Sequence, residues 1–376
     1  MRVYACIDDI EKVARSRLDA NAENYYSSGA VDETTLALNR SDYGRILLRP
    51  RVLRNVTSVT TSTTILGRQV ASPIAIAPAA MQGLAHSDGE LGTAKAAKNT
   101  ASLMILSTYS NTSLEDVISA TPDLPQASES PFWLQLYVHQ DRCISEGLLK
   151  RAEKAGYQAL VLTVDAPVLG RRLKDLRNKF SMPPHLKLAN FDASQGVMTA
   201  SERNSTGATS GAKADASLTW KDIDWLRSVT SMKIVLKGIM THEDALLACQ
   251  WKVDAIIVSN HGGRQLDTCP STISILPEIT AAVKSYSHAH PTLPVPEVYM
   301  DGGIRRGTDV VKALALGARA VFIGRPMLWG LVVGGHEGVE QVLQILNDEL
   351  RNAMALVGVQ SVDEIGEGCI IRKSLL

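Results

Sequence analysis

The chain has 376 residues, 45% of them hydrophobic and 5% aromatic, so it is long enough to bury a large core. Its 39 Lys and Arg balance 39 Asp and Glu, and we therefore expect no general attraction to nucleic acid or to an anionic membrane. The five cysteines have no metal-ligand spacing, the N-terminus lacks the apolar stretch of a signal peptide, and no apolar run approaches a membrane span. These features predict a soluble, cytoplasmic protein without a metal.

Eight short apolar runs follow one another along the chain. Each is apolar nearly throughout, as expected for strands buried on both faces, and helical stretches separate most of them. Eight such units predict an α/β fold, a (β/α)8 TIM barrel, with a doubly wound open sheet as the competing interpretation. The runs begin near Ser72, Ser102, Phe132, Ala159, Lys233, Ala255, Glu297 and Ala320.

We expect residues 1–376 to form a single domain. Residues 1–70 precede the first barrel strand and are predicted to be a helical cap segment, with helices over Ile10–Leu18 and around Ala22–Ser28. Residues 71–360 are predicted to be the barrel.

The longest gap between neighbouring runs lies between the fourth and the fifth. It contains a stretch rich in Ser, Thr, Ala and Gly, and we interpret residues 190–218 as a long mobile loop after strand four. Such a loop would lie at the carboxyl ends of the strands, where active sites of barrels sit. A lid over the site and an inert insertion both remain open.

Polar side chains recur where the predicted strands end. After the last two strands, Asp301 is followed by Gly302, Gly303 and Arg305, and Gly324 is followed by Arg325. Glycines let backbone N–H groups approach an anion, and arginines add forked contacts. The two loops together predict a phosphate site, with ordinary turn glycines as the alternative.

His261 is the strongest candidate for a catalytic base. It follows an apolar strand and precedes two glycines, and Asp165 at another strand end could orient its ring. Arg172 and Arg264 could bind a substrate carboxylate, although surface ion pairs are the simpler interpretation of each alone. Lys237 ends a buried strand, where a Schiff base is conceivable but a cation beside an electron-accepting cofactor fits the phosphate site better.

Several segments together resemble the FMN-dependent α-hydroxy acid oxidase/dehydrogenase family, which includes glycolate oxidase, lactate oxidase and the flavin domain of flavocytochrome b2. The resemblance spans nearly the whole chain. It is carried by the segments NYYSSGAVDETTL, RILLRPRVL, APAAMQ, LQLY, LTVDAPVLGRR, VLKGI, SNHGGRQLD, DGGIRRGTDVVKALALGA and FIGRP.

The resemblance implies an FMN cofactor at the barrel mouth. Its phosphate would lie on the glycines and arginines after the last two strands, with Asp301 at the ribityl chain and Lys237 at the N1/O2 edge of the ring. The implied cofactor-binding residues are Ala79, Ala80, Ser107, Gln135, Thr163, Lys237, Ser259, Asp301, Gly302, Gly303, Arg305, Gly324 and Arg325.

The resemblance also implies a small carboxylic acid substrate. Tyr25, Arg172 and Arg264 match the positions that bind the carboxylate, Tyr137 matches the one that meets the hydroxyl, and His261 matches the base, backed by Asp165. Two electrons would pass to the flavin and leave a 2-oxo acid. Removal of the α-proton and removal of the hydroxyl proton during hydride transfer both remain open.

Departures from the family pattern bear on substrate and location. Ala79 replaces a frequent Thr, and Tyr109 stands where glycolate oxidase has Trp, which indicates a substrate bulkier than glycolate. No haem-binding domain precedes the barrel, which disfavours a flavocytochrome-type electron route. O2 is the expected acceptor. The chain ends in Ser374-Leu375-Leu376 without the basic residue of a peroxisomal signal, which favours the cytoplasm. The family suggests a homotetramer.

We therefore predict FMN-dependent oxidation of an L-2-hydroxy acid, with H2O2 as the second product. Dehydrogenation of an amino or imino acid C–N bond is the first alternative, and an inactive flavin-binding relative is the second. A nucleotide dehydrogenase with a cysteine nucleophile is disfavoured, because no cysteine lies at a strand end.

Overall fold

The computed structural model describes residues 4–121, 132–191 and 214–372. Eight parallel strands close into a barrel in the order β10-β11-β4-β5-β6-β7-β8-β9, which confirms the predicted TIM barrel. The barrel strands are β4 (Ile74–Ile76), β5 (Met104–Ser107), β6 (Phe132–Leu136), β7 (Ala159–Thr163), β8 (Lys233–Ile239), β9 (Ala255–Val258), β10 (Glu297–Asp301) and β11 (Ala320–Ile323).

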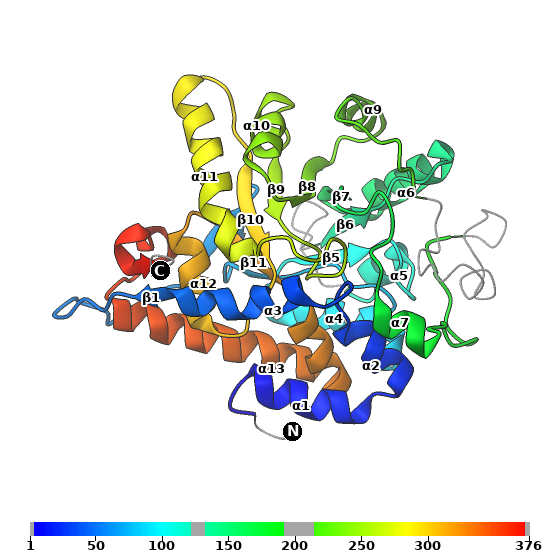
Figure 1. The fold of residues 1–376 in the computed structure, drawn as a ribbon, viewed down its shortest axis with the longest axis horizontal. Coiled ribbons are helices and arrows are strands. Elements are labelled where there is room, and N and C mark those ends of the chain that lie inside the picture. The colour runs from blue at the N-terminus through cyan, green and yellow to red at the C-terminus, as the bar shows by residue number, and fades with distance from the viewer. Residues whose placement is uncertain (1–3, 122–131, 192–213, 373–376) are drawn as a thin grey trace.

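Helices surround the barrel (Figure 1). In the described part of the chain, none of them combines the length and the apolar character that crossing a membrane requires. The helices after the first barrel strand are α4 (Gly89–Asn99), α5 (Leu114–Ser119), α6 (Arg142–Ala155), α7 (Leu173–Asn178), α9 (Asp222–Val229), α10 (His242–Gln250), α11 (Thr272–Ala289), α12 (Gly307–Ala315) and α13 (Arg325–Val357).

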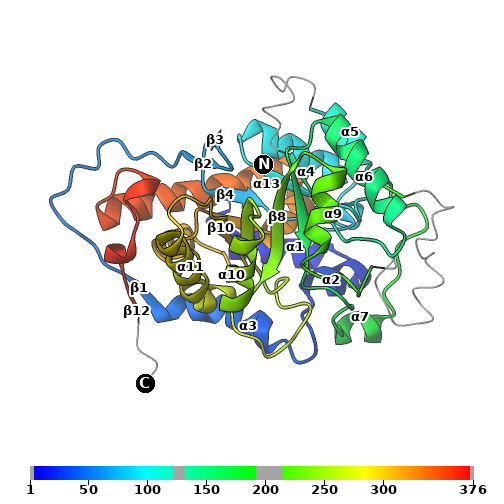
Figure 2. The same cartoon turned by 90° about the horizontal axis from the view of Figure 1, so that it is seen from above.

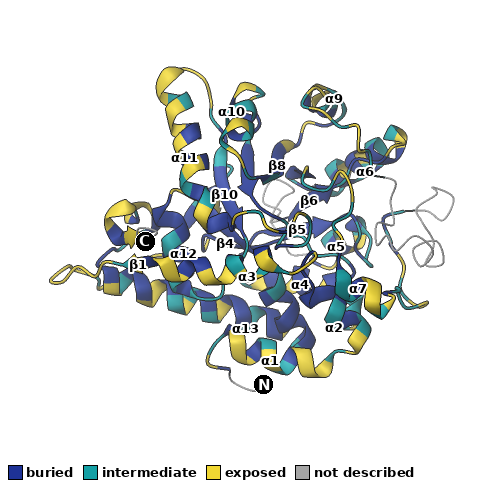
Figure 3. Ribbon diagram, viewed as in Figure 1, coloured by how far each residue is buried: buried dark blue, intermediate teal, exposed yellow. Residues whose placement is uncertain are grey.

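Two layers of apolar side chains hold the barrel together. On β4, Ala75 faces the barrel interior while Ile74 and Ile76 pack against the helices. On β9, Ile257 faces inward and Ile256 outward. Because successive strand residues point to opposite faces and both faces are covered, the strands must be apolar throughout. Figure 3 shows the resulting pattern, with buried strands at the centre and exposed residues on the outer faces of the helices.

A short hairpin closes the amino end of the barrel. Strands β2 (Thr63–Ile65) and β3 (Arg68–Val70) pair in antiparallel fashion, and Ile65 packs with the side chains of the barrel interior. The backbone N–H of Leu66 donates to Glu297 at 3.2 Å, at the start of β10. Figure 2 shows the hairpin at one end and helices α2, α3 and α7 at the other, so the carboxyl end is left for a ligand.

The N-terminal segment supplies three helices, α1 (Ile7–Arg17), α2 (Ala20–Ser27) and α3 (Thr34–Ser41). The first two correspond to the helices predicted there, and the third was not predicted because its apolar residues are few. Helix α1 packs on α13 and α2 packs on α7. The chain continues into β1 (Ile46–Leu48), which pairs with β12 (Ile370–Arg372).

Most of the loop predicted at 190–218 lies outside the described residues, which stop at Phe191 and resume at Ala214. Its described ends are held in place. Asn190 is buried at one end. At the other, Asp215 forms an ion pair of 2.8 Å with Arg142.

Truncation of the hairpin side chain at the barrel floor tests this description. Ile65 is 1% exposed, so Ile65→Ala should leave a cavity and lower the free energy of unfolding by about 2–4 kcal/mol in a urea titration. Ile371→Ala is the matched control, because that side chain is 52% exposed. Equal losses for the two variants would contradict a packed floor.

Candidate active site

A cavity of about 810 Å³ opens at the carboxyl ends of the strands. All but two of the predicted site residues line it, and the two others, Asp165 and Ser259, lie behind the lining and hold it. The predicted residues in the lining are Tyr25, Ala79, Ala80, Ser107, Tyr109, Gln135, Tyr137, Thr163, Arg172, Lys237, His261, Arg264, Asp301, Gly302, Gly303, Arg305, Gly324 and Arg325.

His261 is held from behind by a carboxylate. Its Nδ1 lies 2.7 Å from Oδ1 of Asp165, and its Nε2 lies 3.3 Å from the hydroxyl of Tyr137. An ionised carboxylate only accepts hydrogen bonds, so Nδ1 carries the proton and Nε2 presents its lone pair to the cavity. This arrangement can remove a proton from a bound molecule.

The protonation states suit a base. Burial lowers the pKa of His261 below its ordinary value, although the Asp165 carboxylate opposes this effect. Burial alone would raise the pKa of Asp165, but its interaction with His261 and the charge of Lys237 outweigh burial and lower that pKa. The imidazole therefore rests neutral beside an ionised carboxylate near neutral pH.

The backbone at this histidine turns sharply. His261, Gly262 and Gly263 have φ of 57°, 64° and 75°, a left-handed conformation that glycine adopts at little cost. A Cβ on Gly263 would lie 2.7 Å from the backbone nitrogen of Leu36. Gly263 therefore allows helix α3 to pack against the turn, and Gly262 lies against the guanidinium of Arg325.

A β-bulge makes space for Asp165. The register between β8 and β9 shifts between Lys237 and Ile239, and the intervening Gly238 has φ of 117°. A Cβ on Gly238 would lie 2.6 Å from the Cβ of Asp165. Bulges commonly re-aim side chains next to active sites, and this one brings the carboxylate under the histidine.

A row of polar groups crosses three neighbouring strand ends. The hydroxyl of Ser107 donates to Oε1 of Gln135 at 3.3 Å. The amide nitrogen of Gln135 donates to the hydroxyl of Thr163 at 3.1 Å. The barrel register pairs Ser107 with Gln135, and Thr163 ends the next strand, β7, so the three residues form one polar face in the cavity wall.

Lys237 continues that face as a buried cation. Its ammonium donates to Ser259 Oγ at 2.9 Å and pairs with Asp301 at 3.3 Å. Burial would lower the pKa of Lys237, but the charges of Asp301 and Asp165 outweigh it and raise that pKa. Lys237 therefore stays charged, which disfavours a Schiff base. The fully buried Ser259 also accepts from the backbone of His261.

The cavity wall formed by the loops after β10 and β11 suits an anion. Gly302 and Gly303 have φ of 99° and 77°, and a Cβ on Gly303 would meet the backbone oxygen of Asn39 at 1.7 Å. Burial, then the charges of Arg264 and Arg305, lowers the pKa of Arg325 to about 9. A bound phosphate would relieve this repulsion.

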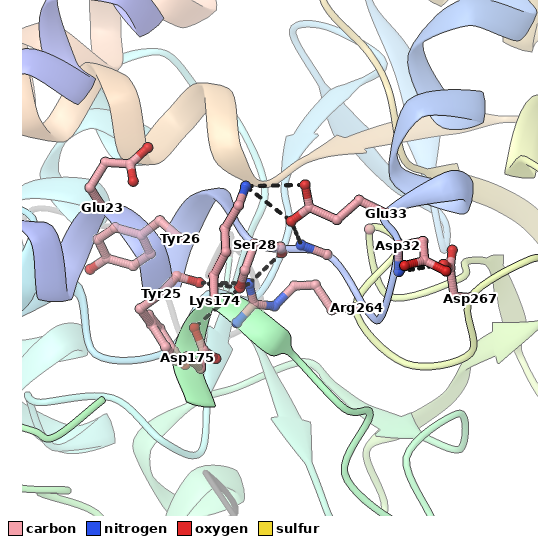
Figure 4. Close-up of polar contacts among 12 residues, drawn as sticks. Glu23, Tyr25, Tyr26, Ser28, Asp32, Glu33, Lys174, Asp175, Arg264 and Asp267 are labelled. Carbon is pink, nitrogen blue, oxygen red and sulfur yellow. Dashed lines mark hydrogen bonds and ion pairs between the residues drawn. The ribbon is translucent and has the colours of Figure 1, made fainter. Parts of the chain in front are cut away.

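The N-terminal helix α2 is held by two site arginines. Arg264 donates to the backbone oxygens of Tyr25 and Ser28 at 2.6 and 2.9 Å (Figure 4), and Arg325 donates to that of Tyr26 at 2.8 Å. The last carbonyls of a helix lack partners within it and attract cations. Sequence reasoning assigned both arginines to ligands alone and missed this second role.

Near Tyr25 the cavity wall holds two cations, the buried Arg172 and the partly buried Arg264; we call this part of the wall the carboxylate end. The guanidinium carbon of Arg264 lies 5.0 Å from the centre of the Tyr25 ring. Burial, followed by the charge of Arg264, lowers the pKa of Arg172 to about 10. Like charges held together in a cavity favour the binding of an anion.

Aromatic rings border the space beside the base. Tyr109 stacks on Tyr137 with ring centres 5.2 Å apart, and Phe191 lies 5.9 Å from Tyr109. Tyr109 and Tyr137 line the cavity that His261 also lines, whereas Phe191 packs on Tyr109 from outside the lining, so the Tyr109 ring would meet the side chain of a substrate.

The structure also brings in residues that the sequence did not single out. Asp175, Gln265 and Arg40 line the cavity. Asp175 stands three residues after Arg172, the spacing at which helix neighbours meet, and that spacing was the available signal. Arg40 carried no signal, because its helix was not predicted.

These features define a barrel oxidoreductase site: an anion cradle and a buried lysine lie at one side, and a base and two arginines lie at the other. Within the described residues, no group of three or more His, Cys, Asp or Glu could hold a metal ion. The chain belongs to the FMN-dependent dehydrogenase family, whose model matches residues 14–372.

Named relatives are similar over nearly their full length. The chain is 47% identical to 2-hydroxyacid oxidase 1 of Mus musculus, covering 99% of this chain and 97% of the mouse protein. It is 46% identical to L-lactate oxidase of Nostoc sp., covering 95% of each. A solved structure of mandelate oxidase with (S)-4-hydroxymandelic acid superposes with a TM-score of 0.85 at 39% identity, covering 98% of each chain.

The bulge at Gly238 provides a test of the site's construction. Gly238→Ala should displace Asp165 and strain the backbone, which lowers the free energy of unfolding by about 1–3 kcal/mol. Gly147→Ala on α6 is the control, because a Cβ there meets no atom within 4 Å and alanine favours a helix. Thermal unfolding of both variants measures the difference. A stable Gly238→Ala protein with unchanged activity would contradict this role of the bulge.

Proposed function

We propose that this protein oxidises an L-2-hydroxy acid to the 2-oxo acid, with FMN as its cofactor and O2 as the acceptor, which yields H2O2. The observation that carries the proposal is the placement of one neutral histidine, with its acceptor nitrogen beside the Tyr137 hydroxyl, in the same cavity as Arg172 and Arg264. The relatives named as 2-hydroxyacid and lactate oxidases support it.

The residues present fit FMN. The glycine cradle suits a phosphate, with Gly303, Arg305, Gly324 and Arg325 holding it. Among the described residues, Oδ1 of Asp301 is buried without a hydrogen-bond partner, which suits a ribityl hydroxyl donor. When bound, FMN supplies the two-electron acceptor.

A flat conjugated ring fits the polar face described above. Ser107, Gln135 and Thr163 would contact its edge, with Ala79 and Ala80 below it. The charged Lys237 would stabilise negative charge that develops on the ring, because a fixed buried cation is already oriented before reaction.

The other side of the cavity would position the substrate. Arg172, Arg264 and the Tyr25 hydroxyl would bind the carboxylate, and Tyr137 would bind the α-hydroxyl. His261 Nε2 would take one proton from the substrate, and Asp165 would stabilise the imidazolium that results. The substrate loses two electrons and two protons in total, one hydrogen from the α-carbon and one from the hydroxyl, and its C–O single bond becomes a carbonyl.

The aromatic wall at Tyr109 and Phe191 bears on the substrate side chain. The Tyr109 ring, which lines the cavity with Phe191 packed on it, would pack against an apolar side chain, and the smallest hydroxy acid, glycolate, would leave it without a partner. We therefore propose a substrate that carries an apolar side chain.

A substrate panel tests the proposal. Purified holoenzyme is mixed in air with L-lactate, longer L-2-hydroxy acids, L-mandelate, glycolate and L-amino acids, and 2-oxo acid and H2O2 are both quantified. We expect one H2O2 for each 2-oxo acid from hydroxy acids, and slower turnover of glycolate. His261→Gln should keep its FMN and lose about 10²–10⁴-fold in kcat.

Two results of the panel would contradict the proposal. Turnover of amino acids alone would identify a C–N dehydrogenase, and full activity of His261→Gln would remove the assigned base.

The pH dependence tests the pair behind the base. Activity needs neutral His261, so kcat/KM should fall as the pH drops through a pKa below the ordinary histidine value. Asp165 raises the pKa of His261, so Asp165→Asn should move this acid limb to lower pH while the maximal rate falls about 10²-fold or more. Asp224→Asn at the exposed surface is the control. A shift of the limb to higher pH in Asp165→Asn would contradict the assignment.

A further inference from the structure

A buried carboxylate lies beside Arg172 and Arg264, the two cations proposed to bind the substrate carboxylate. Asp175 is on helix α7, is 4% exposed and lines the cavity. Figure 4 shows it beside Tyr25 and close to Arg264. The proposed reaction makes no use of it. A buried charge is costly unless it is paired, so its position requires a physical reason.

The contacts of Asp175 are incomplete. Its Oδ1 accepts from the hydroxyl of Ser28 at 3.3 Å. Its Oδ2 lies 4.0 Å from the guanidinium of Arg172 and, within the described residues, has no hydrogen-bond partner. The two side chains therefore form an ion pair without a hydrogen bond, since such bonds need about 3 Å.

Arg172 is loosely held by its other contacts as well. It donates to the backbone oxygen of Arg264 and to Oε1 of Gln265, each at 3.4 Å. A carboxylate with two free oxygens forms shorter, forked bonds to a guanidinium. Arg172 would therefore gain bonding when a carboxylate ligand enters the cavity.

The negative charge of Asp175 also balances the positive charges of Arg172 and Arg264. Burial, then the charge of Arg264, lowers the pKa of Arg172, whereas Asp175 raises it. Burial raises the pKa of Asp175, and both arginines oppose that effect. Asp175 thus offsets the repulsion between the buried Arg172 and the partly buried Arg264, and it would repel an incoming anion.

We propose that Asp175 is the internal counter-ion of the substrate carboxylate site, which balances Arg172 and Arg264 before binding and competes with the ligand's carboxylate for Arg172. This inference rests on the proposed function, because it takes the ligand to be a carboxylate. Asp175 acts through Arg172, so it is a positioning residue. Its effect is to weaken the binding of substrate and product, and so to favour product release.

The test compares a charged ligand with its neutral counterpart. Asp175→Asn keeps an oxygen for Ser28 and removes only the charge. Pyruvate and its neutral amide, pyruvamide, are titrated into FMN-loaded protein, and binding is followed by the flavin absorption change. We expect the Kd for pyruvate to fall about 5- to 10-fold in Asp175→Asn, as loss of one partly screened like charge implies, while the Kd for pyruvamide stays within about twofold.

Asp267→Asn is the matched control. Its carboxylate accepts from the backbone N–H of Asp32 (Figure 4) and from that of Thr35, so the Kd for pyruvate should stay within about twofold. A purely structural role for Asp175 predicts weaker binding of pyruvate, the opposite sign, and weaker or unchanged binding in a folded Asp175→Asn protein would overturn the proposal.

Measurements on the wild-type protein distinguish failure of this inference from failure of the proposed function on which it rests. If wild type oxidises hydroxy acids while Asp175→Asn binds pyruvate no more tightly, the counter-ion role alone is overturned. If wild type neither turns over hydroxy acids nor binds pyruvate, both are overturned.

Discussion

The site depends on one hydrogen bond, the 2.7 Å contact between Asp165 and His261. Several features of the barrel position the two residues for this hydrogen bond. Gly238 bulges β8 so that the carboxylate has room, and Ser259 accepts from the histidine backbone where the chain turns left-handed. The bond fixes which ring nitrogen faces the cavity, and the proposed proton transfer follows from that choice.

The cavity is a joint product of the barrel and the segment before it. Arg264 and Arg325 donate to carbonyls at the end of α2, and this places Tyr25 in the wall. A barrel without that helix would leave both guanidinium groups short of acceptors in a buried place, at a cost in stability. The same two arginines also stand where anions are proposed to bind, so the cap and the ligand site share their cations.

Sequence reasoning reached the barrel and most of the site for a physical reason. Strands buried on both faces must be apolar, so the positions where they end could be predicted from the sequence. A closed barrel brings those ends together at one rim. What it missed depends on three-dimensional context. The bulge at Gly238 depends on the volume of Asp165, the caps on α2 depend on where that helix docks, and the role of Asp175 depends on two arginines far apart in sequence. The hairpin that closes the barrel at Ile65 was likewise not predicted, because the hydrophobic pattern of its segment is weak.

The central claim is that an L-2-hydroxy acid bound in this cavity gives two electrons to the flavin, and that this step does not require O2. An anaerobic single-turnover experiment tests it most directly: the oxidised holoenzyme is mixed with a stoichiometric amount of an L-2-hydroxy acid, and the flavin absorption and the 2-oxo acid formed are measured together. The account predicts bleaching with one 2-oxo acid per flavin, reversed when air is admitted. A flavin that stays oxidised with every L-2-hydroxy acid, or bleaching without a 2-oxo acid, would contradict it.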